Sequence, residues 1–309
     1  MRVNYEKLFK VLEERKLTLT KLSHDLKISS TTLSKLGKGD YISLQTLEKI
    51  SVYLNLQPGD IFSFPQKKRE SAIVTRLRSE KKHKIKGGLY HETQVLLTFN
   101  SNNIEGSTIS LDLTRNIFET NQVLIGQEKT LNIDDVTETI NHFRAIDYML
   151  DIIYEPLNEQ IIKDLHLLLK RNTKDEKLDW FRVGSYKEVP NVVSGYETTP
   201  PEDVACEMSE LINRYENGAK KTFKAIIDFH YHFEKIHPFQ DGNGRVGRLI
   251  AFKELLRHNH VPFTIDQALK NLYYRGFIMY PENKAYLFET CLAGQDKYKK
   301  LCDYFKVTC

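Results

Sequence analysis

Residues 237–248 read HPFQDGNGRVGR, and this stretch decides the interpretation of the whole chain. It gathers an imidazole, a carboxylate, glycines and two guanidinium groups. Apolar residues follow it at helical spacing, so we expect a helix to begin near Asn243. The preceding stretch KAIIDFHYHFEKI predicts another helix, and Pro238 disfavours its continuation. His237 is therefore expected at the exit of one helix, just before the next one begins.

The start of the second helix is suited to binding phosphate. The first turn of a helix carries N–H groups without acceptors in the helix, and the helix dipole favours negative charge there. Gly242 and Gly244 lack side chains, so an anion can approach these amides closely. Arg245 and Arg248 are three residues apart and neighbour each other on the helix, where forked guanidinium groups suit phosphate oxygens. Asp241 suits Mg²⁺, which binds one or two carboxylates together with phosphates and water.

Three interpretations fit these residues. In the first, His237 is a general base, because a histidine with an ordinary pKa near about 6.5 accepts a proton at neutral pH. In the second, the stretch is a solvated glycine-rich turn with two surface arginines. In the third, His230, Glu234 and His237 form a zinc face on a helix, although neither HExxH nor HxxEH occurs there. His230 and His232 are more typical of helix or core histidines.

The stretch matches the motif HxFx(D/E)GNGRxxR of the Fic family at every defined position. The matching residues are His237, Phe239, Asp241, Gly242, Asn243, Gly244, Arg245 and Arg248. The chain thus resembles Fic proteins, which typically transfer AMP from ATP to a protein hydroxyl. The resemblance implies that His237 deprotonates the target hydroxyl and that Asp241 holds Mg²⁺. It also implies that Asn243 and the glycine amides hold the α-phosphate, while the two arginines hold the outer phosphates.

A second pattern lies upstream, in HETQVLLTFNSNNIEGST. Ser101, Glu105 and Gly106 match (S/T)xxxE(G/N), which marks an inhibitory helix in the Fic family. The resemblance implies a helix around 93–106 whose glutamate pairs with Arg248. Arg248 would then be kept from the γ-phosphate of ATP, and the α-phosphorus would be badly placed for attack. Taken alone, the pattern is also typical of an ordinary helix end with Gly106 as its stop. In some family members the glutamate also supports removal of AMP.

Between these segments, WFRVGSYKEVPNVVSGYETTPP departs from helical periodicity and predicts a β-hairpin. Fic proteins carry a hairpin flap at the matching place, where an extended target segment adds as a strand. The residues that the resemblance assigns to the flap are Val183, Gly184, Ser185, Tyr186 and Lys187. A surface hairpin without a binding role is the alternative. Further on, Tyr273 and Tyr274 are candidates for an adenine pocket, with aromatic core packing as the alternative.

The amino terminus predicts a separate helical domain. Residues 1–65 place apolar residues at spacings typical of several short helices with tight turns. The stretch resembles the Cro/C1-type helix-turn-helix family, which implies that residues 22–26 lie in the first helix of the pair and that residues 30–36 form the recognition helix. The residues that would face the major groove are Ser30, Thr31, Thr32 and Lys35. A scaffold for dimerisation or partner contact is the alternative. Sequence-specific binding would need a homodimer, because one helix-turn-helix reads one half-site.

Charge is unevenly distributed along the chain. Residues 1–65 hold ten Lys and Arg against seven Asp and Glu, and residues 66–90 hold nine against two. The remainder carries a net charge of −6 within a total of +4. A basic front and an acidic remainder fit nucleic acid binding at one end. We expect residues 66–84 to be a basic linker that either contacts phosphate or stays solvated.

The expected fold is mainly α-helical. A small, five-helix-like helix-turn-helix domain (1–65) and the basic linker (66–84) precede an all-α Fic domain (85–309) with one β-hairpin flap. At 40% hydrophobic residues, 309 residues suffice for a large core and a small one. No membrane-length apolar run or signal-peptide pattern occurs, so a cytoplasmic location without a membrane partner is expected. The four cysteines are scattered, which indicates neither a zinc site nor a disulfide framework.

The expected function is a self-inhibited protein adenylyltransferase with DNA as a further partner. It would use ATP as substrate and Mg²⁺ as cofactor to transfer AMP to a Ser, Thr or Tyr hydroxyl of a target protein or of itself. The alternative is a DNA-binding transcriptional regulator whose Fic domain senses nucleotide without transfer. Because the GNGR core is intact, adenylyl transfer ranks above the phosphoryl transfer of divergent relatives.

Overall fold

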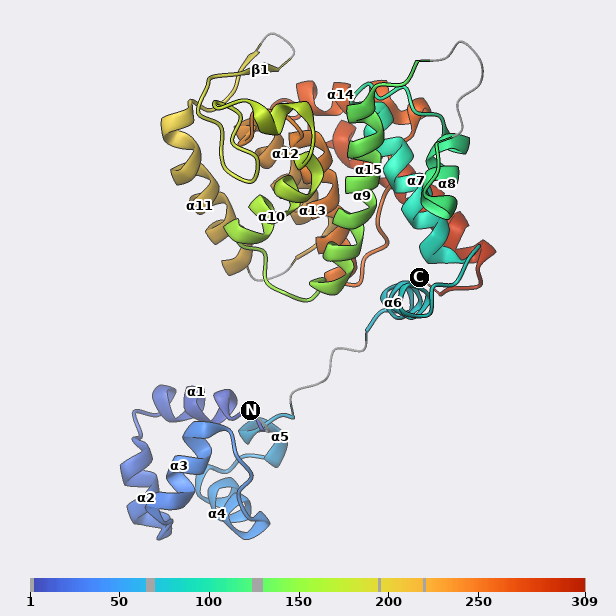
Figure 1. Cartoon of the computed structure of the whole chain (residues 1–309). Coiled ribbons are helices and arrows are strands. Elements are labelled where there is room, and N and C mark those ends of the chain that lie inside the picture. The colour runs from blue at the N-terminus through green and yellow to red at the C-terminus, as the bar shows by residue number, and fades with distance from the viewer. Residues whose placement is uncertain (1–2, 65–69, 124–129, 194–195, 219–220, 309) are drawn as a thin grey trace. The chain divides into compact units, whose positions relative to one another are not determined.

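The protein consists of two helical units (Figure 1). The computed structural model describes residues 3–64, 70–123, 130–193, 196–218 and 221–308. The first unit spans Met1–Arg69 and the second spans Glu70–Cys309. Two short strands, β1 (Val192–Val193) and β2 (Tyr196–Glu197), pair antiparallel in the second unit. The mainly α-helical fold expected from the sequence is confirmed.

The first unit contains five short helices around its own core. They are α1 (Glu6–Glu14), α2 (Leu19–Leu26), α3 (Ser30–Lys38), α4 (Leu44–Leu54) and α5 (Pro58–Ile61). The side chains of Thr18, Ser29 and Ser43 cap α2, α3 and α4 by accepting a backbone N–H, which fixes where these helices begin. Helices α2 and α3 contain the two segments expected for the helix-turn-helix pair.

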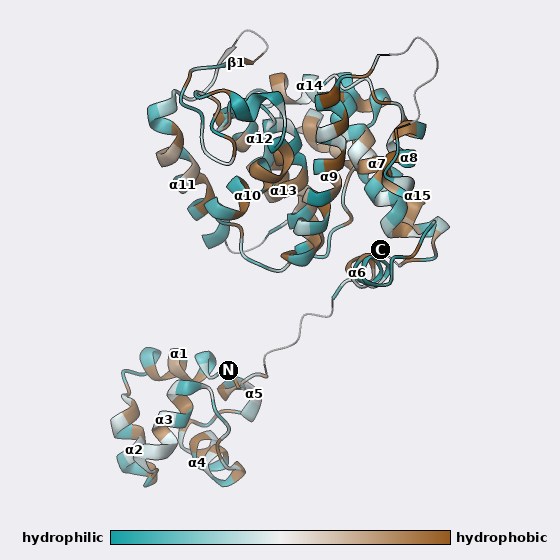
Figure 2. Cartoon of the chain, viewed as in Figure 1, coloured by the Kyte–Doolittle hydropathy of each residue, from teal (hydrophilic) through white to brown (hydrophobic). Residues whose placement is uncertain are grey.

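The second unit is a larger helical bundle. Its helices are α6 (Ala72–His83), α7 (Leu89–Ile104), α8 (Leu111–Thr120), α9 (Ile133–Asp151), α10 (Glu159–Lys170), η1 (Lys174–Lys177), α11 (Pro201–Asn217), α12 (Phe223–Ile236), α13 (Asn243–Arg257), α14 (Gln267–Met279) and α15 (Ala285–Tyr304). Helix α13 packs against α7, α9, α10 and α12, and most of its residues are buried. Figure 2 shows strong hydrophobic colouring where α12 and α13 cross the middle of the unit. The motif helix is therefore fixed by the core.

Helix α6 differs from the linker expected over 66–84. Ser71 caps the helix by accepting the N–H of Val74, and Ile73, Val74 and Leu77 are buried in the core of the second unit. The linker was predicted from the many lysines and arginines of this segment. The same segment also contains apolar residues at helical spacing, which form the buried face of the helix. Among the helices in the described ranges, none combines the length and hydrophobicity that a membrane crossing requires.

Candidate active site

His237 lies at the junction that the sequence predicted. Helix α12 ends at Ile236, and His237 follows as its C-cap in the left-handed region, with φ 53°. Its Nδ1 lies 3.3 Å from the carbonyl oxygen of Glu234. Since a carbonyl only accepts, Nδ1 carries the hydrogen and Nε2 keeps its lone pair. The imidazole is thus oriented as a proton acceptor through Nε2.

Burial lowers the pKa of His237 to about 4. The bond from Nδ1 to the Glu234 carbonyl opposes this effect, while the nearby Lys187 ammonium adds to it. At neutral pH the imidazole is therefore uncharged, as a general base must be.

The turn from His237 into α13 is closed by the side chain of Asn243. Its Oδ1 accepts the N–H of Phe239 and its Nδ2 donates to the carbonyl of Phe239, both at 2.8 Å. Asn243 is 1% exposed, and both polar atoms of its amide are hydrogen-bonded within the loop. In this structure the amide satisfies buried backbone groups of the turn, and the phosphate contact expected of this side chain stays a prediction. Gly242 precedes the helix with φ 79°, a conformation that glycine adopts without strain.

Arg248 is bound by the helix that carries the second motif. Its Nε donates to Ser101 Oγ at 3.0 Å, and its Nη2 donates to Ser101 O at 2.9 Å and to Glu105 Oε1 at 2.7 Å. Arg248 is only 5% exposed. Helix α7 starts four residues before the expected 93, and Glu105 follows its last residue. Gly106 comes next with φ 95°, so the chain turns directly after the glutamate.

The Glu105 carboxylate also lies against the first turn of α13. A Cβ placed on Gly244 would overlap Glu105 Oε1, so the glutamate could not keep this position beside a larger residue. Glycine is therefore needed at 244 for this approach. The carboxylate is held where a helix terminus favours an anion, which is the place that the sequence predicted for phosphate.

Asp241 belongs to a charged cluster that the sequence did not reveal. Asp241 Oδ2 lies 2.8 Å from Lys170 Nζ and 3.3 Å from Arg245 Nη2. Arg245 also bonds Glu138, and Lys170 also bonds Glu138 and Asp175. Burial raises the pKa of Asp241, but Arg245 and Lys170 outweigh burial and hold the pKa below its ordinary value. Arg245 thus neutralises carboxylates in this structure, and the phosphate contact expected of it stays a prediction.

The oxygen ligands around Asp241 are of the type that Mg²⁺ prefers. The Asp241 side chain is 53% exposed, so it is accessible from solvent. Oxygens of Glu138, Asp175 and Asp241 lie within 4.8 Å of one another. Carboxylate oxygens with room for phosphates and water suit Mg²⁺. The exposed Asp241 carboxylate therefore fits the magnesium contact expected of it, while Lys170 Nζ bonds all three carboxylates.

His166 is a second residue that sequence reasoning missed. Its Nδ1 accepts the N–H of Gly184 at 2.9 Å, so its Nε2 carries the hydrogen and donates to the carbonyl of Asp241 at 3.1 Å. Its ring stacks on Phe239 with centroids 4.0 Å apart. Burial lowers the pKa of His166 to about 3, which keeps it neutral. His166 thereby joins α10 to the motif turn and to the loop at Gly184.

The expected flap residues lie in a loop that precedes the strands. Residues 183–187 are anchored to the motif turn, since Lys187 N donates to Pro238 O at 2.9 Å. The two strands come later, with Val192 opposite Glu197. The strands lie within the stretch predicted as a hairpin, whereas Gly184, with φ 79°, forms a turn, so the target-binding role of residues 183–187 stays a prediction. Val192 is 62% exposed, which leaves β1 accessible.

Lys187 connects the strands to the catalytic turn. Its Nζ donates to Asn191 Oδ1 at 2.8 Å and to Ile236 O at 3.5 Å, and it also bonds Thr198 Oγ1. Lys187 is 3% exposed, and burial lowers its pKa to about 8. One buried ammonium therefore joins both ends of the strand pair to the residue before His237.

We expect Lys187→Met to raise the KM for a protein target about 10-fold, because hydrogen bonds to a charged group typically contribute about 1.5–3 kcal/mol. The KM for ATP should change less, because Lys187 Nζ bonds Asn191, Thr198 and Ile236 and none of the glycines in the motif turn. Steady-state kinetics with each substrate varied in turn measures both constants. Lys300→Met, at an exposed position of α15, serves as control. An equal rise in the KM for ATP would contradict the assignment.

Burial and hydrogen bonding bear on two alternatives from the sequence, a zinc site at His230 and His237 and an adenine pocket at Tyr273 and Tyr274. His230 is 1% exposed and its Nε2 bonds the hydroxyl of buried Tyr273. In the described ranges, the grouped ligand atoms that could hold a metal are those of Glu138, Asp175 and Asp241, so His230 and His237 do not share a zinc site. Tyr273 packs in the core, whereas Tyr274 is 42% exposed and donates to Ile104 O.

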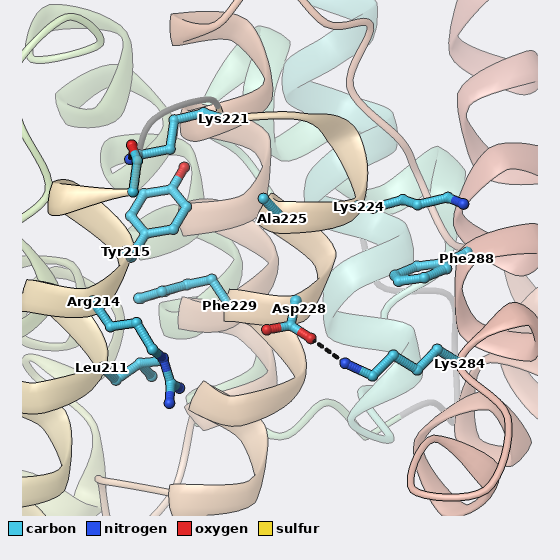
Figure 3. A pocket seen from close by; sticks show the side chains of 11 residues that line it. Leu211, Arg214, Tyr215, Lys221, Lys224, Ala225, Asp228, Phe229, Lys284 and Phe288 are labelled. Atoms are coloured by element: carbon cyan, nitrogen blue, oxygen red, sulfur yellow. Dashed lines mark hydrogen bonds and ion pairs between the residues drawn. The ribbon is translucent and has the colours of Figure 1, made fainter.

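A hollow of about 350 Å³ lies elsewhere, at the N-terminal end of α12 (Figure 3). Basic side chains surround it, and Lys284 Nζ pairs with Asp228 Oδ1 at 2.8 Å. Its lining includes no residue of 237–248. His237 lies beyond the other end of the same helix, so this hollow is separate from the candidate active site.

Helix α3 presents most of the expected DNA-reading side chains to solvent. Ser30, Thr31 and Lys35 are exposed. Thr32 is half-buried, and its hydroxyl lies 3.0 Å from Ser29 Oγ in the cap of the helix. Three of the four side chains are therefore free to reach a nucleic acid.

Comparison with known proteins finds a family similarity in each unit. Residues 156–255 match the Fic/DOC family, and residues 7–67 match the Cro/C1-type HTH DNA-binding domain family. Each match covers part of one unit, and over these residues the chain is similar to the two families. The Fic match contains the complete motif at 237–248 together with α10 and the strand pair.

Relatives and solved structures agree with this assignment. The protein adenylyltransferase Fic of Culex quinquefasciatus is 27% identical over 72% of this chain and 47% of its own length. That of Drosophila willistoni is 30% identical over 57% of this chain and 34% of its own length. The chain thus spans less than half of these relatives. Fic-1 of C. elegans has a TM-score of 0.59 at 18% identity, covering 91% of this chain and 77% of its own. A Fic family protein of Desulfovibrio desulfuricans has a TM-score of 0.58 at 21% identity. The match covers 77% of this chain and 74% of that chain. These structural similarities support the fold.

Proposed function

We propose that this protein transfers AMP from ATP to a hydroxyl group of a protein and that contact with Glu105 inhibits the transfer. One observation carries the proposal. His237 is neutral and oriented, and it lies directly before a helix terminus that an anion can approach because glycine has no side chain. The names of the relatives, which describe them as protein adenylyltransferases, support the same reaction.

Each residue of the motif has a role in the proposed reaction. His237 Nε2 removes the proton of the target hydroxyl, whose oxygen then attacks the α-phosphorus, and pyrophosphate leaves. Backbone N–H groups at Gly244 and its neighbours in the first turn of α13 bind the α-phosphate. Arg248, once released from Glu105, binds an outer phosphate through its forked guanidinium. Asp241 would hold Mg²⁺, which would neutralise phosphate charge. Catalysis rests mainly on positioning and on charge neutralisation.

Two contacts support inhibition by Glu105. Its carboxylate pairs with Arg248 and lies against Gly244, so it competes both for the arginine and for the helix terminus. ATP bound under these conditions lacks the arginine contact and meets a carboxylate near its phosphates, which disfavours the pose needed for in-line attack.

A target segment is proposed to bind along β1 by adding as a strand. Val192 and Val193 are exposed, so their backbone edge is accessible. Lys187 holds this edge close to Ile236, which precedes His237. A hydroxyl on the added strand would then be presented to the imidazole. The target is a Ser, Thr or Tyr side chain of another protein or of this chain.

The pH dependence follows from the pKa of His237. The neutral imidazole is the active form, and its pKa is lowered to about 4. Transfer should therefore be retained as the pH falls from 7 to about 5 and should be lost through about pH 4, whereas an ordinary histidine would lose activity near about 6.5. The pH profile of kcat/KM measures this, with circular dichroism as a control for unfolding. An acid limb centred near 6.5 would contradict it.

DNA binding through α3 is the second proposed function, and it is compatible with the first. The observation that favours it is the exposure of Ser30, Thr31 and Lys35 at the start of a capped recognition helix. Such residues contact base edges and phosphates in helix-turn-helix proteins. Two copies of the chain would be needed to read two half-sites.

We expect the full chain to bind a mixed-sequence DNA duplex with an affinity that falls as salt rises, because phosphate contacts release counterions. Lys35→Ala should reduce the slope of log affinity against log salt by about 0.9, the value of one phosphate contact. Lys49→Ala, at an exposed position of α4, is the matched control. Fluorescence anisotropy at several salt concentrations measures the slopes. Equal slopes for all three proteins would rule out Lys35 as a phosphate contact.

A further inference from the structure

Lys170 lies at the centre of the charged cluster beside the proposed phosphate site. Its Nζ is 2.6 Å from Glu138 Oε1, 2.6 Å from Asp175 Oδ2 and 2.8 Å from Asp241 Oδ2. The side chain is 2% exposed, in contrast to the 53% of Asp241. These carboxylates come from three separate elements, α9, η1 and the turn before α13. One buried ammonium thus bonds one oxygen of each carboxylate.

Without this ammonium, the three carboxylates would form an all-protein cation site. Their ligand oxygens lie within 4.8 Å of one another, and hard divalent cations bind such sets of carboxylate oxygens. Arg245 would remain as the one cationic partner among these side chains, bonded to Glu138 and Asp241. A group of three carboxylates against one guanidinium keeps an excess of negative charge, which attracts a divalent cation even when no nucleotide is present.

We propose that Lys170 is a positioning residue that makes metal binding depend on nucleotide. Its ammonium occupies the space among the three carboxylates and orients Asp241, so that this carboxylate binds Mg²⁺ only together with the phosphates of ATP. The inference rests on the proposed function for the role of Asp241. The consequence is selectivity: free Mg²⁺ is not retained, and the cation arrives with the substrate that requires it.

The test is a titration of nucleotide-free, full-length protein with Mn²⁺, in which electron paramagnetic resonance measures the free ion. Lys170→Met should bind Mn²⁺ at least about 10-fold more tightly than the wild type, because removal of one neighbouring positive charge strengthens the attraction. Lys170→Arg, which keeps the charge, should remain close to the wild type. Lys170→Met combined with Asp241→Asn should lose the gain. A purely structural role of Lys170 would not tighten metal binding.

A second variant and a second measurement test the proposal if Lys170→Met folds poorly. If Lys170→Met unfolds too readily for titration, Lys170→Gln removes the charge but keeps an amide that can donate hydrogen bonds to the carboxylates, and tightening in the same direction is expected. In either variant, Mn²⁺ without nucleotide should raise Tm more than it does in the wild type, because a ligand of the native state stabilises it. Equal Mn²⁺ affinity and an equal rise in Tm in variant and wild type would overturn the proposal.

The outcomes separate this inference from the proposed function. Failure of AMP transfer in every variant, together with tighter nucleotide-free Mn²⁺ binding by Lys170→Met, would reject the transferase and retain the role of Lys170 in excluding cations. Normal AMP transfer with unchanged Mn²⁺ binding would reject the role of Lys170 and retain the transferase.

Discussion

Replacing Glu105 by glycine is expected to raise AMP transfer about 5- to 150-fold, the range that corresponds to a coupling free energy of about 1–3 kcal/mol. The substitution removes the carboxylate 2.7 Å from Arg248 Nη2 and frees the first turn of α13. Arg248 keeps its bonds to Ser101, so its side chain remains ordered. Incorporation of AMP into protein per unit time measures the effect.

Two variants identify the origin of the increase. Glu105→Gln keeps the size of the side chain but removes its charge, so it should give a smaller gain than glycine. Arg248→Ala added to Glu105→Gly should abolish the gain, because the released arginine is the group that binds the outer phosphate. A gain that persists without Arg248 would show that Glu105 acts in another way.

Replacing His237 by alanine in the Glu105→Gly protein is expected to lower transfer about 100- to 10,000-fold, which is the usual contribution of general-base catalysis. His237 adopts φ 53°, so alanine also brings backbone strain. His237→Asn separates the two effects, because asparagine tolerates this conformation but cannot act as the base. Both variants should lose activity equally.

The control for this loss is His232→Ala. His232 lies on the same helix, half-buried, and its Nε2 is 3.7 Å from Asp228 Oδ2. It lies outside the turn that contains the motif, so its replacement should leave transfer near the starting value. Retention of full activity in His237→Asn would contradict the role of His237 as base.

Much of this site follows from local sequence rules. The helix end at His237 follows from the proline after it, and the helix start at Asn243 follows from the apolar spacing after that residue. The family resemblance placed Glu105 opposite Arg248, and the structure contains that pair at 2.7 Å. These features depend on residues close in sequence or on a pattern already known.

The remaining features depend on contacts between distant segments. Lys170 ends an ordinary amphipathic helix, and its three carboxylate partners come from α9, η1 and the motif turn, so no spacing reveals the cluster. The side chain of Asn243 serves the turn because the buried backbone of Phe239 needs partners, which depends on burial. The many basic residues of α6 led to the prediction of a linker, although Ile73 and Leu77 are buried in the core.

The most direct test of the central claim compares label from α-labelled and γ-labelled ATP, incorporated into protein in a cell lysate and with the purified chain alone. The proteins are the wild type, Glu105→Gly, and Glu105→Gly with His237→Ala. The account predicts that α-label rises in the single variant and vanishes in the double variant, while γ-label is not incorporated by any of them. Absence of α-label in the single variant, or transfer of γ-label in its place, would contradict adenylyl transfer by this site.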